Sequence, residues 1–322
     1  MRIVLCYPVE PRHIEQISRD APSAEIVDAG QERVATEILT ADVFCGHPKV
    51  PVPWDQVVRQ GRLQWIQSSA AGVDHCLVPS VVRSEILVTS ASGVLADQVA
   101  EHAIALLTAL LRNLPEFFRA QQARRYERRP TRDLHDSTVG IVGLGGVGRR
   151  LAELLAAFRA PIIATDYFPV DKPPHVKALW PADRLDDLLA ASTAVVLCAP
   201  LTDETRGMIC ASTLERMPRG SLLINVARGP LVVEEDLVEA IESGQLGGAA
   251  LDVTEQEPLP VTSRLWDLPG VILTPHVAGQ SARRTDNMTH LFCENLRRYQ
   301  SGLPLINVVD KRLGFPRRTA TL

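Results

Sequence analysis

The sequence is poor in the features that mark membrane-spanning and nucleic-acid-binding proteins. Aromatic residues make up 5% of its 322 residues, and 34 Lys and Arg nearly balance 38 Asp and Glu, for a net charge of −4. This charge argues against a nucleic-acid or membrane partner. The longest apolar helical run, Ala103 to Leu111, falls far short of the roughly 20 residues that span a bilayer. The apolar stretch at the N-terminus is too short for a signal peptide, so we expect a cytoplasmic protein.

The six cysteines also lack the spacing of a metal site or a redox pair. No CxxC pair and no metal-binding Cys/His pattern occurs among them. We therefore expect small buried side chains in a reducing compartment, and no metal. The remaining composition, 46% hydrophobic and 22% charged residues, is ordinary for a globular chain, and its length favours roughly two domains.

A glycine motif lies in the second half of the chain, directly after the apolar run 139–142. Gly143, Gly145 and Gly148 have the GxGxxG spacing, and a helix-like segment follows over 149–158. Gly143 allows a tight turn, Gly145 lets the backbone approach a pyrophosphate, and Gly148 lets helix and strand pack closely. The motif predicts a dinucleotide site, and its position requires another folded unit before it.

An acidic residue supports this interpretation. Asp166 ends a second apolar run, Pro161 to Thr165, and stands 23 residues after Gly143. A carboxylate about 20 residues past the motif binds a ribose hydroxyl in dinucleotide-binding folds. Because its negative charge repels a 2′-phosphate, Asp166 favours NAD over NADP as the cofactor.

Short apolar runs alternate with helical patterns in both halves of the chain. In the first half the strand-like runs are Ile3–Cys6, Glu25–Ala29, Val43–Cys45, Leu63–Ser68 and Ile86–Ser90. After Asp166 they are Val195–Ala199, Leu222–Ala227, Ala249–Val253 and Val271–Thr274. This alternation predicts an α/β protein with two doubly wound parallel-sheet domains, a flavodoxin-like substrate domain and a Rossmann NAD-binding domain.

Two helical segments are expected to connect these domains. One is a single long helix over 96–119, and the other, over 283–300, leads the chain back to the first domain. We therefore predict a discontinuous substrate domain of residues 1–98 and 287–322, and an NAD-binding domain of residues 99–286. The arginine-rich stretch 124–132 is typical of a solvated connection, with a substrate or subunit contact as the alternative.

A glycine turn in the first half is a candidate anion site. The segment Ser68–Asp74 follows a strand and is expected to begin a helix. Ligands bind at the carboxyl ends of strands in open α/β sheets, and free N–H groups there could hold a carboxylate. A plain strand–helix turn is the alternative.

Polar residues follow the last three apolar runs of the second half. Arg228 comes after the first, Asp252 and Glu257 after the second, and His276 after the third. Since the carboxyl ends of parallel strands meet at one crevice, these side chains are expected to converge beside the dinucleotide. A cation can hold a substrate carboxylate and polarise a carbonyl, while an imidazole oriented by a carboxylate exchanges a proton. This set suits reduction of a 2-oxo acid.

At these residues the chain resembles the D-isomer-specific 2-hydroxyacid dehydrogenase family over nearly its whole length. The matching segments are Ser69–Asp74, Val99–His102, the glycine motif, Pro200–Gly207, Asn225–Gly229, Ala250–Pro258 and Thr274–Gly279. The resemblance implies that Arg228 binds substrate and assists catalysis, that His276 is the acid/base, and that Glu257 is its partner. Glu257 is preferred to Glu255 because it directly precedes Pro258. His102 matches a position that is mainly structural.

The resemblance also implies the binding residues. The substrate carboxylate meets backbone N–H groups that match Ala71 and Gly72. Gly146 and Val147 match contacts to the pyrophosphate, Asp166 to the adenosine ribose, and Asp252 to the carboxamide. Further coenzyme-lining positions match Pro200, Thr205, Val226, Ala227, Arg228, His276 and Gly279.

The implied activity is hydride transfer between NAD(H) and a small D-2-hydroxy acid or 2-oxo acid, such as glyoxylate, hydroxypyruvate or a phosphoglycerate-like compound. A homodimer formed through the NAD-binding domain is expected. Phosphoglycerate dehydrogenases commonly carry an extra C-terminal regulatory domain, so an allosteric role of that kind is less favoured. Formate is disfavoured because formate dehydrogenases of the family place glutamine at the position of Glu257. The alternatives are a nucleotide-sensing corepressor-like scaffold and a phosphite dehydrogenase.

Overall fold

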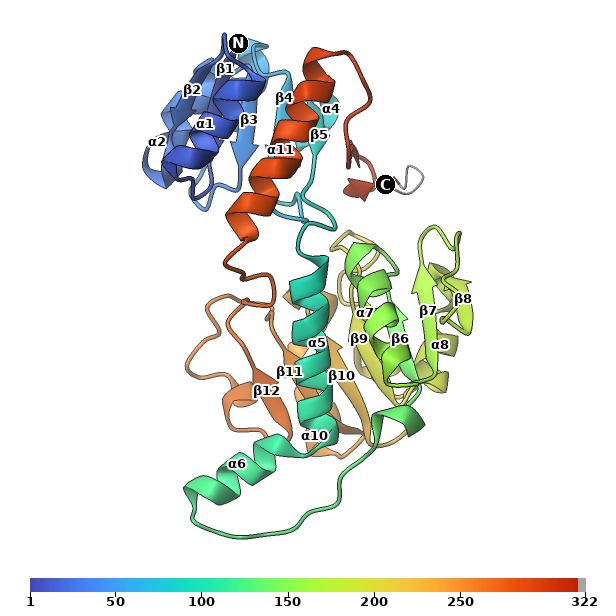
Figure 1. The fold of residues 1–322 in the computed structure, drawn as a ribbon. Helices are drawn as coiled ribbons and strands as arrows, with labels where there is room; N and C mark the ends of the chain where they lie inside the picture. The colour runs from blue at the N-terminus through green and yellow to red at the C-terminus, as the bar shows by residue number, and fades with distance from the viewer. Residues whose placement is uncertain (318–322) are drawn as a thin grey trace. The chain divides into compact units, whose positions relative to one another are not determined.

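The computed structural model, which describes residues 1–317, divides the chain into two compact units (Figure 1). One unit comprises Met1–Leu95 together with the segment that begins at Ser281, and the other comprises Ala96–Gln280. The sequence placed these boundaries at residues 98 and 287. Residues 318–322 of the predicted return segment lie outside the described residues.

The first unit, here called the N-terminal unit, is a parallel sheet covered by helices. Its strand order is β2-β1-β3-β4-β5, the flavodoxin-like order. The strands are β1 (Arg2–Cys6), β2 (Glu25–Asp28), β3 (Val43–Gly46), β4 (Trp65–Ser68) and β5 (Leu87–Thr89). The helices are α1 (Pro11–Asp20), α2 (Gly30–Glu37), α3 (Trp54–Gln60), α4 (Pro79–Arg83) and α11 (Arg284–Gln300). Apolar strands buried on both faces explain the near-continuous hydrophobic runs of the sequence.

The returning segment is built into this unit through buried polar contacts. Asn295 of α11 is fully buried and donates to Gln67 Oε1 at 2.9 Å, while its Oδ1 accepts the Ile306 N–H at 2.7 Å. The tail then pairs with the end of β5, where Thr89 forms an antiparallel bridge to Val308. Because a buried amide needs these partners, Asn295 fixes where the tail rejoins the sheet.

The second unit, here called the cofactor unit, holds a seven-stranded parallel sheet of order β12-β11-β10-β9-β6-β7-β8. Its strands are β6 (Val139–Val142), β7 (Ile162–Asp166), β8 (Ala178–Pro181), β9 (Ala194–Leu197), β10 (Ser221–Asn225), β11 (Leu246–Leu251) and β12 (Val271–Leu273). Its helices are α5 (Ala96–Leu111), α6 (Leu114–Gln122), α7 (Gly146–Ala157), α8 (Leu185–Ala191), α9 (Ala211–Leu214) and α10 (Glu234–Glu242). The strand order reverses between β6 and β9, which is where dinucleotides bind in such sheets.

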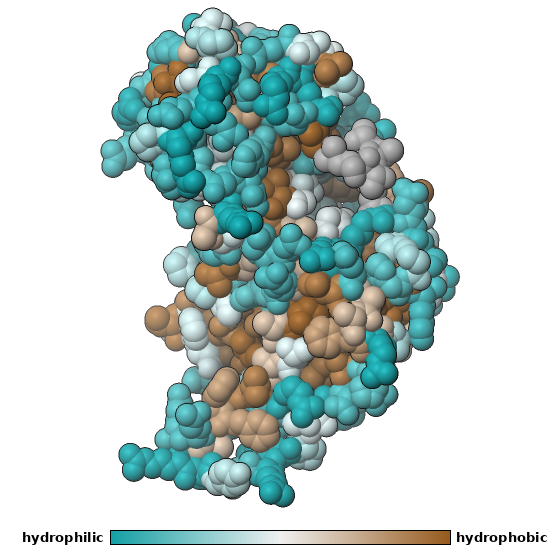
Figure 2. All heavy atoms as spheres, viewed as in Figure 1, coloured by the Kyte–Doolittle hydropathy of each residue, from teal (hydrophilic) through white to brown (hydrophobic). Residues whose placement is uncertain are grey.

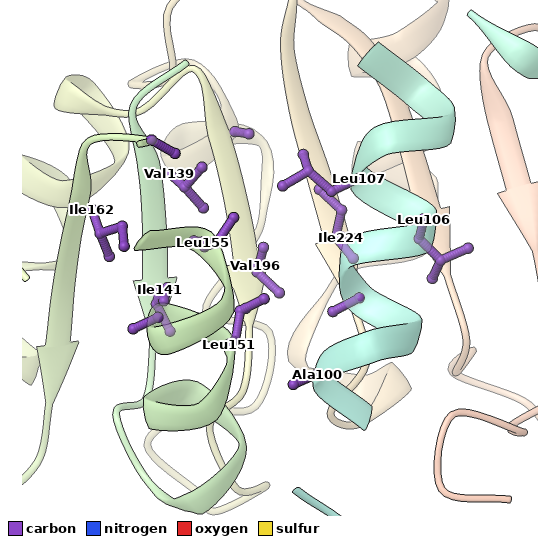
Figure 3. Packing of buried hydrophobic residues seen from close by; sticks show 14 of the residues in the cluster. Ala100, Leu106, Leu107, Val139, Ile141, Leu151, Leu155, Ile162, Val196 and Ile224 are labelled. Atoms are coloured by element: carbon purple, nitrogen blue, oxygen red, sulfur yellow. The ribbon is translucent and has the colours of Figure 1, made fainter. Parts of the chain in front are cut away.

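Helices α5 and α7 supply much of the core above this sheet. Leu151 and Leu155 of α7 and Leu107 of α5 are fully buried, in the same apolar cluster as Ile141 of β6 and Ile224 of β10 (Figure 3). Burying one such side chain stabilises the fold by about 1.5–3 kcal/mol. The strand ends that carry the candidate site are therefore held by a rigid, close-packed layer.

Three details of the predicted secondary structure are wrong. The expected helix 96–119 is two helices, because Asn113 adopts a left-handed conformation (φ 57°) between α5 and α6. The segment after β4 forms turns rather than a helix, and α4 begins only at Pro79. Strand β8 was not predicted, since Ala178–Pro181 is a short edge strand that contains a proline.

All six cysteines are free thiols. Within residues 1–317, none of the helices combines the length and the apolarity needed to cross a membrane.

Candidate active site

The predicted catalytic residues follow three adjacent strands of the cofactor unit. Asn225, Leu251 and Leu273 stand at the carboxyl ends of β10, β11 and β12, and the register pairs each with its neighbour. Because these strands are parallel, the loops that carry Arg228, Glu257 and His276 leave the same edge of the sheet.

His276 and Glu257 form a hydrogen-bonded pair at this edge. The His276 Nδ1 lies 2.8 Å from the Glu257 Oε2, and both side chains are substantially exposed, at 50% and 40%. A carboxylate acceptor assigns the proton to Nδ1, which leaves Nε2 to exchange a proton with a ligand. The contact comes from Glu257, while the neighbouring Glu255 uses its backbone N–H to bind Glu234.

The backbone of His276 is held in an unusual conformation. Its φ is +53°, a left-handed value that costs a non-glycine residue roughly 1–2 kcal/mol. Asp252 supports this turn, because its backbone oxygen accepts the His276 N–H at 2.7 Å. Its carboxylate accepts the next two N–H groups, those of Val277 and Ala278, both at 2.9 Å. Asp252, which is 2% exposed, therefore holds the backbone that carries the imidazole.

Arg228 stands on a turn that a buried asparagine shapes. The Asn225 side chain accepts the Ala227 N–H at 3.0 Å and donates to the Arg228 carbonyl at 2.9 Å. The next residue, Gly229, packs so closely on the following loop that a Cβ there would lie 1.9 Å from the Thr254 oxygen. Thr254 in turn donates its N–H to Glu257 Oε1 at 3.3 Å, so the turn of Arg228 adjoins the loop of Glu257.

The glycine motif has the geometry that a pyrophosphate requires. Gly143 has φ +94°, and a Cβ there would meet the Ala199 backbone at 2.8 Å. A Cβ on Gly148 would lie 2.1 Å from the Gly143 oxygen, so helix α7 can approach β6 only through glycine. In the described part of the chain, residues 1–317, no atom outside the neighbours of Gly145 in sequence lies within 4 Å of a Cβ built on it, which leaves open space before the first turn of α7. The residues present therefore fit a dinucleotide.

The other predicted coenzyme residues lie along the same sheet edge. Asp166 ends β7, and its carboxylate accepts the N–H groups of Leu144 at 2.7 Å and Phe168 at 2.8 Å. Thr205 donates to the Pro200 carbonyl at 2.8 Å in the loop after β9. Of the remaining predicted residues, Val226 and Ala227 follow β10, Gly146 and Val147 begin α7, and Gly279 follows His276.

The predicted carboxylate site lies in the N-terminal unit, in the turn after β4. The Ser68 hydroxyl accepts the Ala70 N–H at 3.1 Å and lies 3.1 Å from the Gly72 carbonyl, which shapes the turn. Among residues 1–317, the N–H groups of Ala71 and Gly72 have no hydrogen-bond acceptor. The turn thus offers two donors, although not from a helix N-terminus as predicted.

The sequence analysis treated His102 as mainly structural and did not predict its contacts beside the turn of His276. His102 of α5 places its Nε2 3.0 Å from the Thr274 Oγ1 and 3.5 Å from the Asp252 Oδ1. No spacing in the sequence relates His102 to Thr274, 172 positions later. Its match to a structural family position was the available signal.

Comparison with known proteins identifies the family. Residues 104–278 match the model of the D-isomer specific 2-hydroxyacid dehydrogenase, NAD binding domain. The chain belongs to this family. It is therefore an oxidoreductase with an NAD-binding domain.

Relatives of known sequence agree with this assignment. The glyoxylate reductase of Thermofilum pendens is 35% identical over 73% of this chain and 71% of that protein. The D-3-phosphoglycerate dehydrogenase of Archaeoglobus fulgidus is 29% identical over 96% of this chain, which spans 59% of the length of that enzyme.

Solved structures share the fold over nearly all of the chain. A D-isomer specific 2-hydroxyacid dehydrogenase from Xanthobacter autotrophicus, in complex with NADPH and MES, has a TM-score of 0.83 and 31% identity, covering 98% of this chain and 99% of that one. The NADPH-dependent glyoxylate/hydroxypyruvate reductase of Sinorhizobium meliloti, in complex with NADP and sulfate, has a TM-score of 0.83 and 28% identity with the same coverage.

Proposed function

We propose that this protein reduces small 2-oxo acids to D-2-hydroxy acids with NADH, and that glyoxylate and hydroxypyruvate are its substrates. The observation that carries the proposal is the 2.8 Å pair of His276 and Glu257, on loops that leave the same sheet edge as the loop of Arg228. An acid oriented by a carboxylate and a neighbouring cation are what reduction of a 2-oxo acid needs.

His276 is proposed to move the proton. With Nδ1–H donated to Glu257, the Nε2 of the protonated ring gives its proton to the substrate oxygen as the carbonyl is reduced. In the reverse direction the same nitrogen removes the hydroxyl proton. Glu257 keeps the ring in this orientation and stabilises the charge of the imidazolium. The bound nicotinamide supplies the hydride that completes the reduction.

Arg228 is proposed to bind and polarise the substrate. Its guanidinium is positively charged throughout the working pH range and can hold a carboxylate or a developing oxyanion with paired N–H groups. The turn fixed by Asn225 limits where this charge can lie. The N–H groups of Ala71 and Gly72 are the proposed anchor of the substrate carboxylate.

The test is NADH oxidation against a panel of glyoxylate, hydroxypyruvate, phosphohydroxypyruvate, pyruvate and formaldehyde. We expect turnover with the first two, and D-glycerate rather than L-glycerate from hydroxypyruvate. Formaldehyde, which lacks a carboxylate, serves as the matched negative. If no compound of the panel is reduced by a protein that still binds NADH, the result would favour the alternative of a nucleotide-sensing scaffold. A separate assay with phosphite and NAD would test phosphite oxidation.

NADH is the proposed coenzyme, although the two structural neighbours were crystallised with NADPH and NADP. The carboxylate of Asp166 is fixed by two backbone N–H groups at the end of β7, where a ribose hydroxyl would meet it. The next four residues, 167–170, contain no Lys or Arg to neutralise a 2′-phosphate. The fixed negative charge of Asp166 disfavours NADPH, and the cation beside this segment is Arg149 of α7, which donates to the Val170 carbonyl at 3.2 Å.

Replacing Asp166 by Ala is expected to lower kcat/KM for NADH about tenfold to a hundredfold and to leave the NADPH value unchanged or higher. The reason is the loss of a charged hydrogen bond worth about 1.5–3 kcal/mol. Initial rates with both coenzymes measure the ratio, and the exposed Asp183, replaced by Ala, is the matched control. A wild-type enzyme that prefers NADPH would contradict the argument.

A homodimer through the cofactor unit is also proposed. Figure 2 shows apolar surface over parts of α5 and α7, while the exposed positions of α5 are Asp97, Glu101 and Ala105. Phe118 of α6 is 58% exposed, and Tyr126, in the arginine-rich stretch, is 98% exposed. Exposed apolar area of this kind is typical of a subunit contact, so a second copy of the chain is the proposed partner.

A further inference from the structure

A chain of hydrogen bonds leads from helix α5 to the turn of His276. The Thr274 hydroxyl donates its hydrogen to the Asp252 Oδ1 at 2.6 Å. A hydroxyl has one hydrogen, so at its 3.0 Å contact with His102 Nε2 the Thr274 oxygen must accept. This assigns the proton of His102 to Nε2. The direction of the chain is therefore His102 to Thr274 to Asp252.

Asp252 connects Thr274 to the turn of His276 by hydrogen bonds. Its Oδ1 accepts both the Thr274 hydroxyl and the Val277 N–H, and its Oδ2 accepts the Ala278 N–H. Its backbone oxygen accepts the N–H of His276. A buried carboxylate stays in one place only when such donors surround it, and this one has donors from the Thr274 hydroxyl and from the His276 turn.

Helix α5 holds His102, the first residue of this series of hydrogen bonds, in a fixed position. The residues that flank His102 on the buried side of α5, Ala100 and Ala103, are fully buried, and Leu107 lies in the same core as Ile224 (Figure 3). His102 itself is 23% exposed. A side chain on a packed helix can fix the position of a loop more closely than the loop can by itself.

We propose that His102 is a positioning residue for the acid/base His276. By donating to Thr274 it orients the hydroxyl toward Asp252, and Asp252 then holds residues 276–278 in the left-handed turn that aims the imidazole. This inference rests on the proposed role of His276 in catalysis. It assigns no contact between His102 and the substrate.

The test compares variants that break the hydrogen bonds between His102, Thr274 and Asp252 with a variant that preserves them. His102→Leu removes the donor, His102→Gln keeps a side-chain N–H, and Thr274→Val removes the hydroxyl at nearly constant volume. Because a small misplacement of a catalytic group can cost up to about a hundredfold in rate, we expect kcat for glyoxylate to fall about tenfold to a hundredfold in the first and third variants. The KM for NADH should change less than about threefold, and His102→Gln should recover most of kcat.

Thr108→Val is the matched control for Thr274→Val. The Thr108 hydroxyl is also on a partly buried side chain of the cofactor unit, and within residues 1–317 it bonds only to carbonyls of its own helix, those of Ile104 and Ala105. We expect wild-type kcat from this variant. If His102→Leu does not fold, Thr274→Val decides the question, and a wild-type kcat in a folded Thr274→Val protein would overturn the proposal.

A spectroscopic readout separates this inference from the proposed function. In protein labelled with ¹⁵N-histidine, wild-type His102 should show the Nε2–H tautomer, and Thr274→Val should shift the ring signals of His276. If the wild type reduces none of the acids, the proposed function fails, yet these signals still test the hydrogen bonds from His102 through Thr274 to Asp252. Unchanged His276 signals in Thr274→Val, or an Nδ1–H tautomer of His102, would overturn the positioning role whatever the activity.

Discussion

His276→Ala is expected to lower kcat with glyoxylate about a hundredfold to ten-thousandfold while NADH still binds. General acid–base catalysis contributes a factor of this size, and alanine has no group that can donate the proton. The imidazole is substantially exposed and its contact is with Glu257 rather than with the glycine motif. Its loss should therefore leave the coenzyme site in place. NADH oxidation rates and a fluorescence titration of NADH measure the two effects.

His135→Ala is the matched control for this variant. His135 also belongs to the cofactor unit, is 51% exposed, and lies 3.4 Å from a carboxylate, that of Asp136. It follows α6 rather than the strand ends of the site, so wild-type rates are expected. Equal rates for His276→Ala and wild type would remove the acid/base assignment, and a joint loss of turnover and NADH binding would show that the residue supports the fold of the site.

The placement of the candidate site could be predicted because it depends on strand ends. An apolar run followed by a polar residue shows where a buried strand stops, and parallel strands bring their carboxyl ends to one edge. The runs that end near Asn225, Leu251 and Leu273 are visible in the sequence, and the sheet pairs these three positions in register. The loops that carry Arg228 and His276 are thereby brought to one edge.

What the sequence could not show depends on contacts between distant elements. His102 looks like any polar residue on a helix, and its contact with Thr274 exists only because α5 packs on the sheet. The break at Asn113 has a local signal, Pro115 two residues later, but a break needs the left-handed turn that tertiary packing selects. The edge strand β8, Ala178–Pro181, is only four residues long and ends in a proline, so pattern alone does not separate it from a loop.

The contacts that hold the turn of His276 could not be predicted either. The left-handed backbone of His276 could not be predicted from its residue type alone, because histidine adopts that conformation only occasionally and where surrounding bonds hold it. Asp252 supplies those bonds with both carboxylate oxygens, so its predicted contact with the coenzyme carboxamide stays a prediction, while its contacts to Val277 and Ala278 are observed.

Arg228→Gln is expected to lower kcat/KM for glyoxylate about a hundredfold to a thousandfold, the loss that follows removal of one preorganised donor at a developing oxyanion. Glutamine keeps a donor but has no charge, so the KM for the oxo acid should rise as well. The kcat/KM of Arg228→Lys should lie between the values of the wild type and Arg228→Gln, because lysine keeps the charge and lacks the paired N–H groups. Initial-rate measurements over a range of glyoxylate concentrations give both constants.

Arg219→Gln provides the matched control for this charge removal, since Arg219 is an exposed residue of the same unit that donates to the Ser243 carbonyl. Its constants should equal those of the wild type. Asn225 and the close packing of Gly229 hold the backbone of this turn in the variant, although the Arg228 guanidinium also donates to the Ala227 carbonyl at 2.7 Å. A change confined to NADH affinity would show that Arg228 binds the coenzyme rather than the substrate. Unchanged kcat and KM in Arg228→Gln would contradict the proposal that Arg228 polarises the substrate carbonyl.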